Sequence, residues 1–183
     1  MNIDNLSGRV IGQYQLRDLL GAGGMGAVYR AYQPLLNREV AIKVISSRLS
    51  NDVEFLERFR REAQTSASLQ HPNIIPIYDF GSIDDISYIV MPLLRGGSLQ
   101  ERIKQSVETR RPRPSLVEVS YLLNQLASAL DYAHNRGVIH RDIKPANVMF
   151  DTQGIAYLVD FGIAKIANAT TGLTQSGVAM GTP

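Results

Sequence analysis

The chain contains no cysteine, which excludes a disulfide framework and a thiolate metal site and gives no indication of secretion. It also lacks any run of about 18 apolar residues, and its start, MNIDNLSGRVIGQYQL, has no apolar stretch after a basic segment. Neither sign of charge dominates, since the formal net charge is +2 and 20% of the residues are charged, so composition does not call for nucleic acid as a partner. We therefore expect a soluble, cytoplasmic chain whose partners must be inferred from its motifs.

The chain has enough apolar residues for a core. Its 183 residues are 44% hydrophobic, and this length fits one domain or two small lobes that share a cleft. The first half predicts a five-stranded sheet with one helix, because β-prone segments surround a stretch with helical periodicity. The predicted strands are residues 14–20, 27–32, 39–45, 74–80 and 86–92, the last two joined by the turn GSIDD, and the helix begins at Asn51 with Glu54 completing a capping box.

The second half predicts mostly helix. A short helix over residues 99–105 precedes ETRRPRP, which is either a solvated basic loop or an anion-binding patch. Ser115 and Glu118 form another capping signature for a helix that runs to about Asn135. This helix is apolar over most of its circumference, so we expect it to need neighbours on several sides, and few remain in the chain. Short β-prone segments follow at residues 138–139, 148–150 and 157–159.

Two features of the first half suggest phosphate binding. The stretch LLGAGGMGAVYRA places glycines at positions 21, 23, 24 and 26 between two strands, where backbone N–H groups can approach a phosphate. A glycine-rich hairpin turn without a ligand explains the same pattern, and a dinucleotide fingerprint would need a helix after the glycines. Lys43 ends the segment VAIK and shares a strand face with Ala41. It is either an exposed strand lysine or a cation held by Glu62, an acid on the apolar helix face of Phe55 and Phe59.

The most specific stretch is HRDIKPANVMF, in which His140, Arg141, Asp142, Lys144 and Asn147 fall within eight residues. It lies on a predicted loop between a buried helix and a strand, where polar side chains can converge without entering a core. VDFG follows with Asp160 before a glycine. This combination predicts a catalytic loop rather than an ordinary turn.

With these motifs in order, the chain resembles the eukaryotic-type serine/threonine protein kinases, most closely their bacterial branch. The resemblance extends from Tyr14 onward. It implies an α+β, bilobal protein-kinase-like fold with a five-stranded antiparallel N-lobe, one helix in that lobe and an incomplete, mainly helical C-lobe. The implied divisions are an N-terminal extension over residues 1–13, the N-lobe and hinge over 14–94, and a partial C-lobe that ends in the activation segment over 95–183.

The resemblance also implies the roles of individual residues. Asp142 would accept the proton of the attacking hydroxyl, Lys144 would stabilise the transferred phosphoryl group, and Lys43 would hold the ATP phosphates with Glu62 as its partner. Asn147 and Asp160 would bind Mg²⁺, with Mn²⁺ as an alternative. The expected nucleotide contacts are Leu20, Gly21, Ala22, Gly23, Gly24, Met25, Gly26, Val28, Ala41, Lys43, Met91, Pro92, Leu94 and Met149. Pro92 stands where many relatives have glutamate, but the family uses backbone groups there and at Leu94.

The family pattern further suggests that Arg141 binds a phosphate group on the activation segment. Thr174 and Ser176 are the first candidates for the phosphorylated residue, ahead of Thr170 and Thr171. A solvated Ser/Thr-rich loop explains these residues equally well. Thr182 would contact the catalytic loop. Because the family's domain continues past GTP, we expect a truncated chain with a mobile tail, an exposed apolar patch and impaired activity.

We expect the chain to transfer the γ-phosphoryl group of ATP to Ser and Thr hydroxyls of protein substrates. The alternatives are a non-catalytic nucleotide-binding or interaction module and, less compatible with the motifs, a small-molecule kinase. Self-phosphorylation, dimerisation and a membrane-anchored parent protein stay open.

Overall fold

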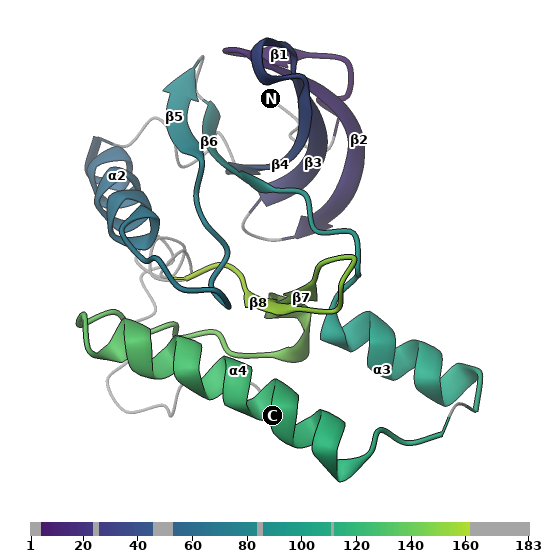
Figure 1. Ribbon diagram of the computed structural model, residues 1–183. Helices are drawn as coiled ribbons and strands as arrows, with labels where there is room; N and C mark the ends of the chain where they lie inside the picture. Colours follow the sequence, from purple (N-terminus) through teal and green to yellow (C-terminus); the bar gives the residue numbers. More distant parts are fainter. Residues whose placement is uncertain (1–4, 24–25, 46–52, 84–85, 111, 162–183) are drawn as a thin grey trace. The chain divides into compact units, whose positions relative to one another are not determined.

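The computed structural model describes residues 5–23, 26–45, 53–83, 86–110 and 112–161, with only the backbone for 53–55 (Figure 1). Its described residues form two compact units. The first contains residues 5–68 and 76–93, and the second contains residues 69–75 and 94–161. Each unit has its own hydrophobic core.

The first unit is built on an antiparallel sheet that has six strands among the described residues, in the order β1-β2-β3-β4-β6-β5. The strands are β1 (Val10–Ile11), β2 (Tyr14–Gly23), β3 (Gly26–Gln33), β4 (Arg38–Ile45), β5 (Asp79–Ile83) and β6 (Ile86–Pro92), with the 3-10 helix η1 (Pro34–Leu36) between β3 and β4. The sheet curves so strongly that Tyr14 of β2 donates a hydrogen bond to Asp79 Oδ2 of β5, 2.8 Å away, although three strands separate them. Helix α2 (Val53–Ala67) lies beside β5, where Phe59 packs edge-on against Phe80 (Figure 1).

Two predictions for this sheet need correction. The predicted count of five strands omits β1, which is only two residues long but pairs with Tyr14 and Gln15. Leu6, in the predicted N-terminal extension, is buried, and its N–H donates to the Tyr29 hydroxyl. The strand predicted at residues 74–80 is shifted, because pairing with β6 begins only at Asp79 and continues through Ile83, into the predicted turn.

The second unit contains two helices and a small hairpin. They are α3 (Leu99–Glu108), α4 (Leu116–His134), the 3-10 helix η2 (Pro145–Asn147), β7 (Val148–Phe150) and β8 (Ala156–Leu158), which pairs with β7. Both helices begin with a complete capping box, Ser98 with Glu101 and Ser115 with Glu118. The capping box at Ser115 confirms the predicted start of α4.

Asn73 joins α4 to the hairpin. Its side-chain amide donates to Gln125 Oε1 on α4 and to the Ala156 carbonyl of β8, both at 2.9 Å. The β-prone segment at residues 138–139 is not a strand, because the Val138 N–H donates to the Ala133 carbonyl and thereby closes the end of α4.

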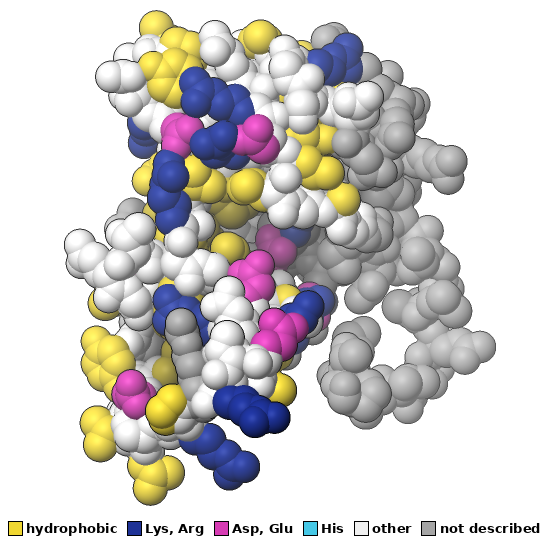
Figure 2. All heavy atoms as spheres, turned by 90° about the vertical axis from the view of Figure 1, so that its right-hand side faces the viewer, with side chains coloured by type: hydrophobic (Ala, Val, Ile, Leu, Met, Phe, Trp, Pro, Cys, Tyr) yellow, Lys and Arg dark blue, Asp and Glu magenta, His cyan; other side chains and the backbone are white. Residues whose placement is uncertain are grey.

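The predicted exposed apolar patch is present on α4. Only Ala129 and Ala133 of this helix are fully buried, and Leu116 is 88% exposed. Other exposed apolar side chains of the helix are Val117, Val119, Tyr121 and Leu123. Hydrophobic side chains are visible at the surface in Figure 2.

The outer surface of the first unit carries charged side chains of both signs (Figure 2). Arg17 and Arg30 pair with Glu39, and Arg30 also contacts Asp18. Such interspersed surface pairs each contribute little to stability. In the part of the chain that the structure covers, no helix is long and apolar enough to cross a membrane.

Candidate active site

The strand register places several predicted nucleotide contacts on one face of the sheet in the first unit. Lys43 lies opposite Val28, and Val28 lies opposite Gly21. Ala41, two residues before Lys43 and therefore on the same face, lies opposite Met91. Ile89, which the sequence reading did not include, lies opposite Lys43 and is fully buried. The strand pairing thus surrounds the Lys43 side chain with the apolar residues Val28, Ala41 and Ile89.

Lys43 is buried, with 7% of its surface exposed, so the alternative of an exposed strand lysine is wrong. All of β4 from Val40 to Ile45 is buried, which is why alternation alone could not decide the question. Glu62 is half-buried on α2, on the same helix side as the buried Phe59. Both Lys43 and Glu62 have interaction partners. A buried ammonium requires such partners.

The glycine-rich segment needs its glycines for different reasons. Gly26 has a φ of +148°, and a Cβ there would collide with the Val44 backbone, so glycine is required by the fold. Gly21 and Gly23 have open space where a Cβ would be. Packing within the described chain therefore does not demand glycine at these two positions, whereas close approach of a ligand would. Gly24 and Met25 lie outside the described residues.

Three predicted site residues converge in the second unit: Asp142 and Lys144, expected to be catalytic, and Asn147, expected to bind the metal. Lys144 Nζ lies 2.8 Å from Asp142 Oδ2, and Asn147 Nδ2 donates to the same oxygen at 2.9 Å and to the Asp142 carbonyl at 2.8 Å. Asn147 is held by η2, which Pro145 begins with its fixed φ. Partial burial would raise the pKa of Asp142, but the hydrogen bonds from Lys144 and Asn147 and the charge of Lys144 outweigh it and lower this pKa below its ordinary value. Asp142 is therefore a carboxylate at neutral pH.

His140, to which the sequence reading gave no role, connects this loop to the segment around Asp160. The ring is almost completely buried, its Nε2 lies 2.8 Å from the Val159 carbonyl, and its Nδ1 accepts from the Asp142 N–H at 3.3 Å. Because a carbonyl only accepts, Nε2 carries the proton and the ring is neutral. Burial lowers the pKa of His140, against the opposing effect of the hydrogen bond to Val159. The ring also packs against Phe161 with 4.5 Å between ring centroids.

Two residues of these motifs have left-handed backbone conformations. Arg141 has a φ of +70° and Asp160 a φ of +66°. Non-glycine residues at such angles are uncommon and are often held in place at functional sites. The side chain of Arg141 is exposed, whereas Asp160 is half-buried.

Gly96 joins the segment after Leu94 to β7, the strand of Met149, and Leu94 and Met149 are both predicted to contact the nucleotide. The Gly96 N–H donates to the Phe150 carbonyl at 2.8 Å, and the Phe150 N–H donates to the Gly97 carbonyl at 2.9 Å. Arg102 of α3 donates to the Gly96 carbonyl and lies 3.6 Å over the Phe150 ring. The segment after Leu94 is thus fixed against β7, the strand that carries Met149.

The remaining predicted nucleotide contacts differ in how exposed they are. Leu20 and Ala22 are exposed on β2, while Pro92 and Leu94 are half-buried. The candidate phosphorylation sites and Thr182 lie outside the described residues, as does the tail predicted to be mobile.

Comparisons with known proteins agree with these motifs. Residues 14–182 match the family model described as "Protein kinase domain". The chain is 43% identical over 173 residues to the serine/threonine-protein kinase PrkC of Bacillus subtilis, covering 94% of the chain and 26% of that protein. It is 41% identical over 179 residues to PknH of Mycobacterium bovis, covering 98% of the chain and 29% of the relative. The chain thus spans between a quarter and a third of these relatives.

A solved structure gives the same result for the fold. The crystal structure of the PknI kinase domain of Mycobacterium tuberculosis aligns with a TM-score of 0.73 at 37% identity, covering 86% of this chain and 61% of that one. The predicted protein-kinase-like fold is therefore confirmed. With a family model that matches nearly its whole length, the chain belongs to the protein kinase family.

Proposed function

We propose that the chain is the catalytic region of a serine/threonine protein kinase, which transfers the γ-phosphoryl group of ATP to Ser and Thr hydroxyls of proteins. The observation that carries this proposal is the cluster of Asp142, Lys144 and Asn147, joined by contacts of 2.8–2.9 Å. Phosphoryl transfer depends on positioning and on neutralising charge, and this cluster offers an anion, a cation and an amide in one place.

Asp142 orients the acceptor hydroxyl and takes its proton. Its Oδ2 is occupied by Lys144 and Asn147, whereas Oδ1 accepts no hydrogen bond from any residue that the structure describes. As the hydroxyl oxygen bonds to the γ-phosphorus, the bond from that phosphorus to the bridging oxygen breaks, ADP departs and the hydroxyl proton moves to Asp142. The lowered pKa of Asp142 makes it a weak base, so its main contribution is orientation, with proton transfer late in the step.

The sheet face in the first unit supplies the proposed nucleotide contacts. Val28 lies opposite Lys43 in the register and Ala41 lies opposite Met91, and these three apolar side chains suit the flat face of adenine. Lys43 lies among them as the cation for the phosphates, and Glu62 is its proposed partner. Gly21 and Gly23 leave the backbone open to a phosphate.

The residues present fit a magnesium ion that is shared with a nucleotide. Because the two hydrogen bonds of Asn147 use its nitrogen, its Oδ1 faces no donor among the described residues and is available as a ligand. Mg²⁺ prefers oxygen ligands and is commonly bound by one or two carboxylates together with substrate phosphates. The described residues contain no cluster of three metal-ligating acids or histidines, which agrees with a site that needs the phosphates. We propose Asn147 and Asp160 as the protein ligands, and Mg²⁺ would neutralise charge on the phosphates.

We also propose the division into an N-terminal extension over residues 1–13, an N-lobe with hinge over 14–94 and a C-lobe region from 95 onward. What supports it is the change from the first compact unit to the second between Leu93 and Leu94. By the same family reasoning, ATP and Ser/Thr-containing proteins are its proposed partners, and the cytoplasm is its proposed location.

Radiolabelled ATP, Mg²⁺ and a mixture of Ser and Thr peptides provide the test, with both the 183-residue chain and the complete product of its gene as enzyme. We expect phosphoserine and phosphothreonine. Asp142→Asn keeps the shape of the side chain but removes its charge, and we expect transfer to fall by about 10²-fold or more. Asp131→Asn makes the same change at an exposed position of α4 and should leave the rate unaltered. Full activity of the Asp142→Asn variant would refute the assignment, and ATP binding without transfer in either form would favour a non-catalytic module.

A further inference from the structure

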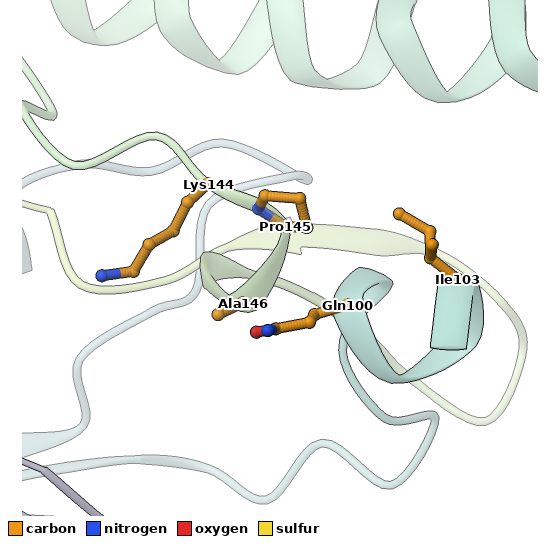
Figure 3. Close-up of a pocket in the computed structure, with 5 residues that line it drawn as sticks. All are labelled: Gln100, Ile103, Lys144, Pro145 and Ala146. Carbon is orange, nitrogen blue, oxygen red and sulfur yellow. The ribbon is translucent and has the colours of Figure 1, made fainter. Parts of the chain in front are cut away.

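A small cavity lies between α3 and η2 in the second unit (Figure 3). Its volume is about 250 Å³, and it is lined by Gln100, Ile103, Lys144, Pro145 and Ala146. Small-molecule sites usually measure about 300 to 1,000 Å³, so this cavity suits one or two amino-acid side chains rather than a nucleotide. None of its lining residues other than Lys144 belongs to the proposed catalytic or nucleotide site.

The cavity is close to the proposed phosphoacceptor. Lys144 contributes to its wall, and the ammonium group of the same residue lies 2.8 Å from Asp142 Oδ2. Ala146, the most distant lining residue of this loop, is four positions after Asp142. Because an extended chain advances about 3.3 Å per residue, a peptide whose hydroxyl meets Asp142 reaches the cavity within about three or four residues.

The lining is apolar and contains no acid. Ile103, Pro145 and Ala146 supply apolar surface, and Gln100 supplies an uncharged amide that points toward Ala146 (Figure 3). The one charged residue of the wall is Lys144, which extends away from α3 in this view. Glu101, although adjacent to Gln100, does not line the cavity, because its carboxylate accepts hydrogen bonds from the Ser98 N–H and hydroxyl in the cap of α3. A Lys or Arg side chain in the cavity would therefore find no acid in its wall, and the one nearby carboxylate, that of Asp142, is already paired with Lys144.

Both walls are held in place before a peptide arrives. The capping box fixes the start of α3, and Arg102 ties this helix to the Gly96 carbonyl. Asn147 is buried and anchors η2 through its bonds to Asp142. A cavity with fixed walls loses little entropy when it binds a side chain, which favours selectivity.

We propose that this cavity binds an uncharged, apolar side chain of the protein substrate within about four residues of the phosphoacceptor, and that Gln100, Ile103 and Ala146 set this preference. The inference rests on the proposed kinase activity. It names the substrate class as proteins with an aliphatic residue, not a basic one, near the Ser or Thr that is phosphorylated.

The test is a set of peptides with one central Ser and a single varied residue, Leu, Lys or Glu, at each position within about four residues of it. With the complete gene product, we expect Leu to raise kcat/KM about tenfold over Lys at one of these positions, as partial burial of an aliphatic side chain would give. No preference at any position, or a preference for Lys or for Glu, overturns the proposal.

Two pairs of variants locate the preference in the cavity. Gln100→Glu adds an acid to the wall and should shift the ratio of kcat/KM for the Lys peptide over the Leu peptide by about fivefold toward Lys, the size of an exposed ion pair. Gln105→Glu makes the same change on an exposed position of α3 outside the cavity and should not shift it. Ile103→Ser should weaken the preference for Leu, whereas Val107→Ser, also exposed on α3, should not.

The outcomes separate this inference from the proposed function. If no peptide is phosphorylated by the unaltered protein, the proposed kinase activity fails. If peptides are phosphorylated but Gln100→Glu and Gln105→Glu have the same effect, the activity stands and the cavity assignment is wrong.

Discussion

Replacing Gly96 by alanine tests how the segment after Leu94 is held against β7. An added Cβ at this position would lie 2.7 Å from the Phe150 carbonyl oxygen and 2.8 Å from its carbonyl carbon, and it would also collide with the Asp151 carbonyl oxygen. Ordinary contacts of a Cβ begin at 3.4 Å. Because all three atoms belong to the backbone, no side chain can rotate away, and the two segments must separate by more than about 0.7 Å.

That separation breaks specific contacts. The hydrogen bonds from the Gly96 N–H to Phe150 and from the Phe150 N–H to Gly97 are 2.8 and 2.9 Å long, so a shift of this size takes both beyond good geometry. Each contributes about 1 kcal/mol net, and a buried group left without a partner costs about 1 to 3 kcal/mol. We expect Gly96→Ala to lower the free energy of unfolding by about 2 to 4 kcal/mol. The displacement also moves Leu94 relative to Met149, so the KM for ATP should rise.

Urea unfolding followed by circular dichroism measures the first effect, and a titration of ATP in the kinase assay measures the second. Gly21→Ala is the matched control for stability, because open space surrounds its Cβ position and its φ is ordinary. This control should be neutral or slightly stabilising. If Gly96→Ala unfolds at the same urea concentration as Gly21→Ala, the close approach of the two backbones does not hold the segment, and the reasoning is refuted.

Three further predictions concern the second unit. Burial lowers the pKa of His140 below its unfolded value of about 6.5, so the unfolded chain binds the proton at a higher pH than the folded chain does. The free energy of unfolding should therefore be unaffected by this group above about pH 6.5 and should fall as the pH drops below that value. Thermal unfolding at several pH values should show a smaller loss of stability for His140→Gln. Ser115→Ala removes the N-cap of α4 and should lower the free energy of unfolding, measured with urea, by about 1 kcal/mol. A variant that unfolds at the same urea concentration as the unaltered protein would show that the cap is dispensable. Asn147→Ala should raise the Mg²⁺ concentration for half-maximal transfer about tenfold or more, and an unchanged Mg²⁺ dependence would exclude it as a ligand.

The strands that could be predicted from the sequence are those with clear β-propensity and turn signals. The segments at 14–20, 27–32 and 39–45 correspond to β2, β3 and β4 within a few residues. The start of α4 was predictable because Ser115 and Glu118 determine it locally. These features depend on interactions between residues close in the sequence, which a sequence shows directly.

The errors have tertiary causes. β1 is too short for a periodic pattern and exists because β2 offers it an edge. The apolar residues 74 and 75 are buried against the hairpin of the second unit, where Ile75 N–H donates to Leu158, so they do not extend β5. Val138 has the propensity of a strand residue, but its N–H is used to end α4.

In the candidate site too, features that depend on residues close in the sequence could be predicted, and features that depend on tertiary contacts could not. The ordered motifs identified Asp142, Lys144 and Asn147, which the fold brings together. The burial of Lys43 could not be read from its strand, since that depends on what covers both faces of the sheet. The link from His140 to Val159 was also hidden, because it joins residues 19 positions apart. The cavity beside α3 needed the structure, since its two walls come from segments far apart in the sequence.

The backbone angle of Asp160 means that this position has two separate requirements. Asparagine tolerates a left-handed φ about as well as aspartate, since its short polar side chain can hydrogen-bond locally, whereas alanine does not. Asparagine at 160 therefore removes the charge alone, while alanine removes the charge and adds a conformational penalty of about 1 to 2 kcal/mol. Comparing the two substitutions would divide the importance of this residue between its chemistry and its shape.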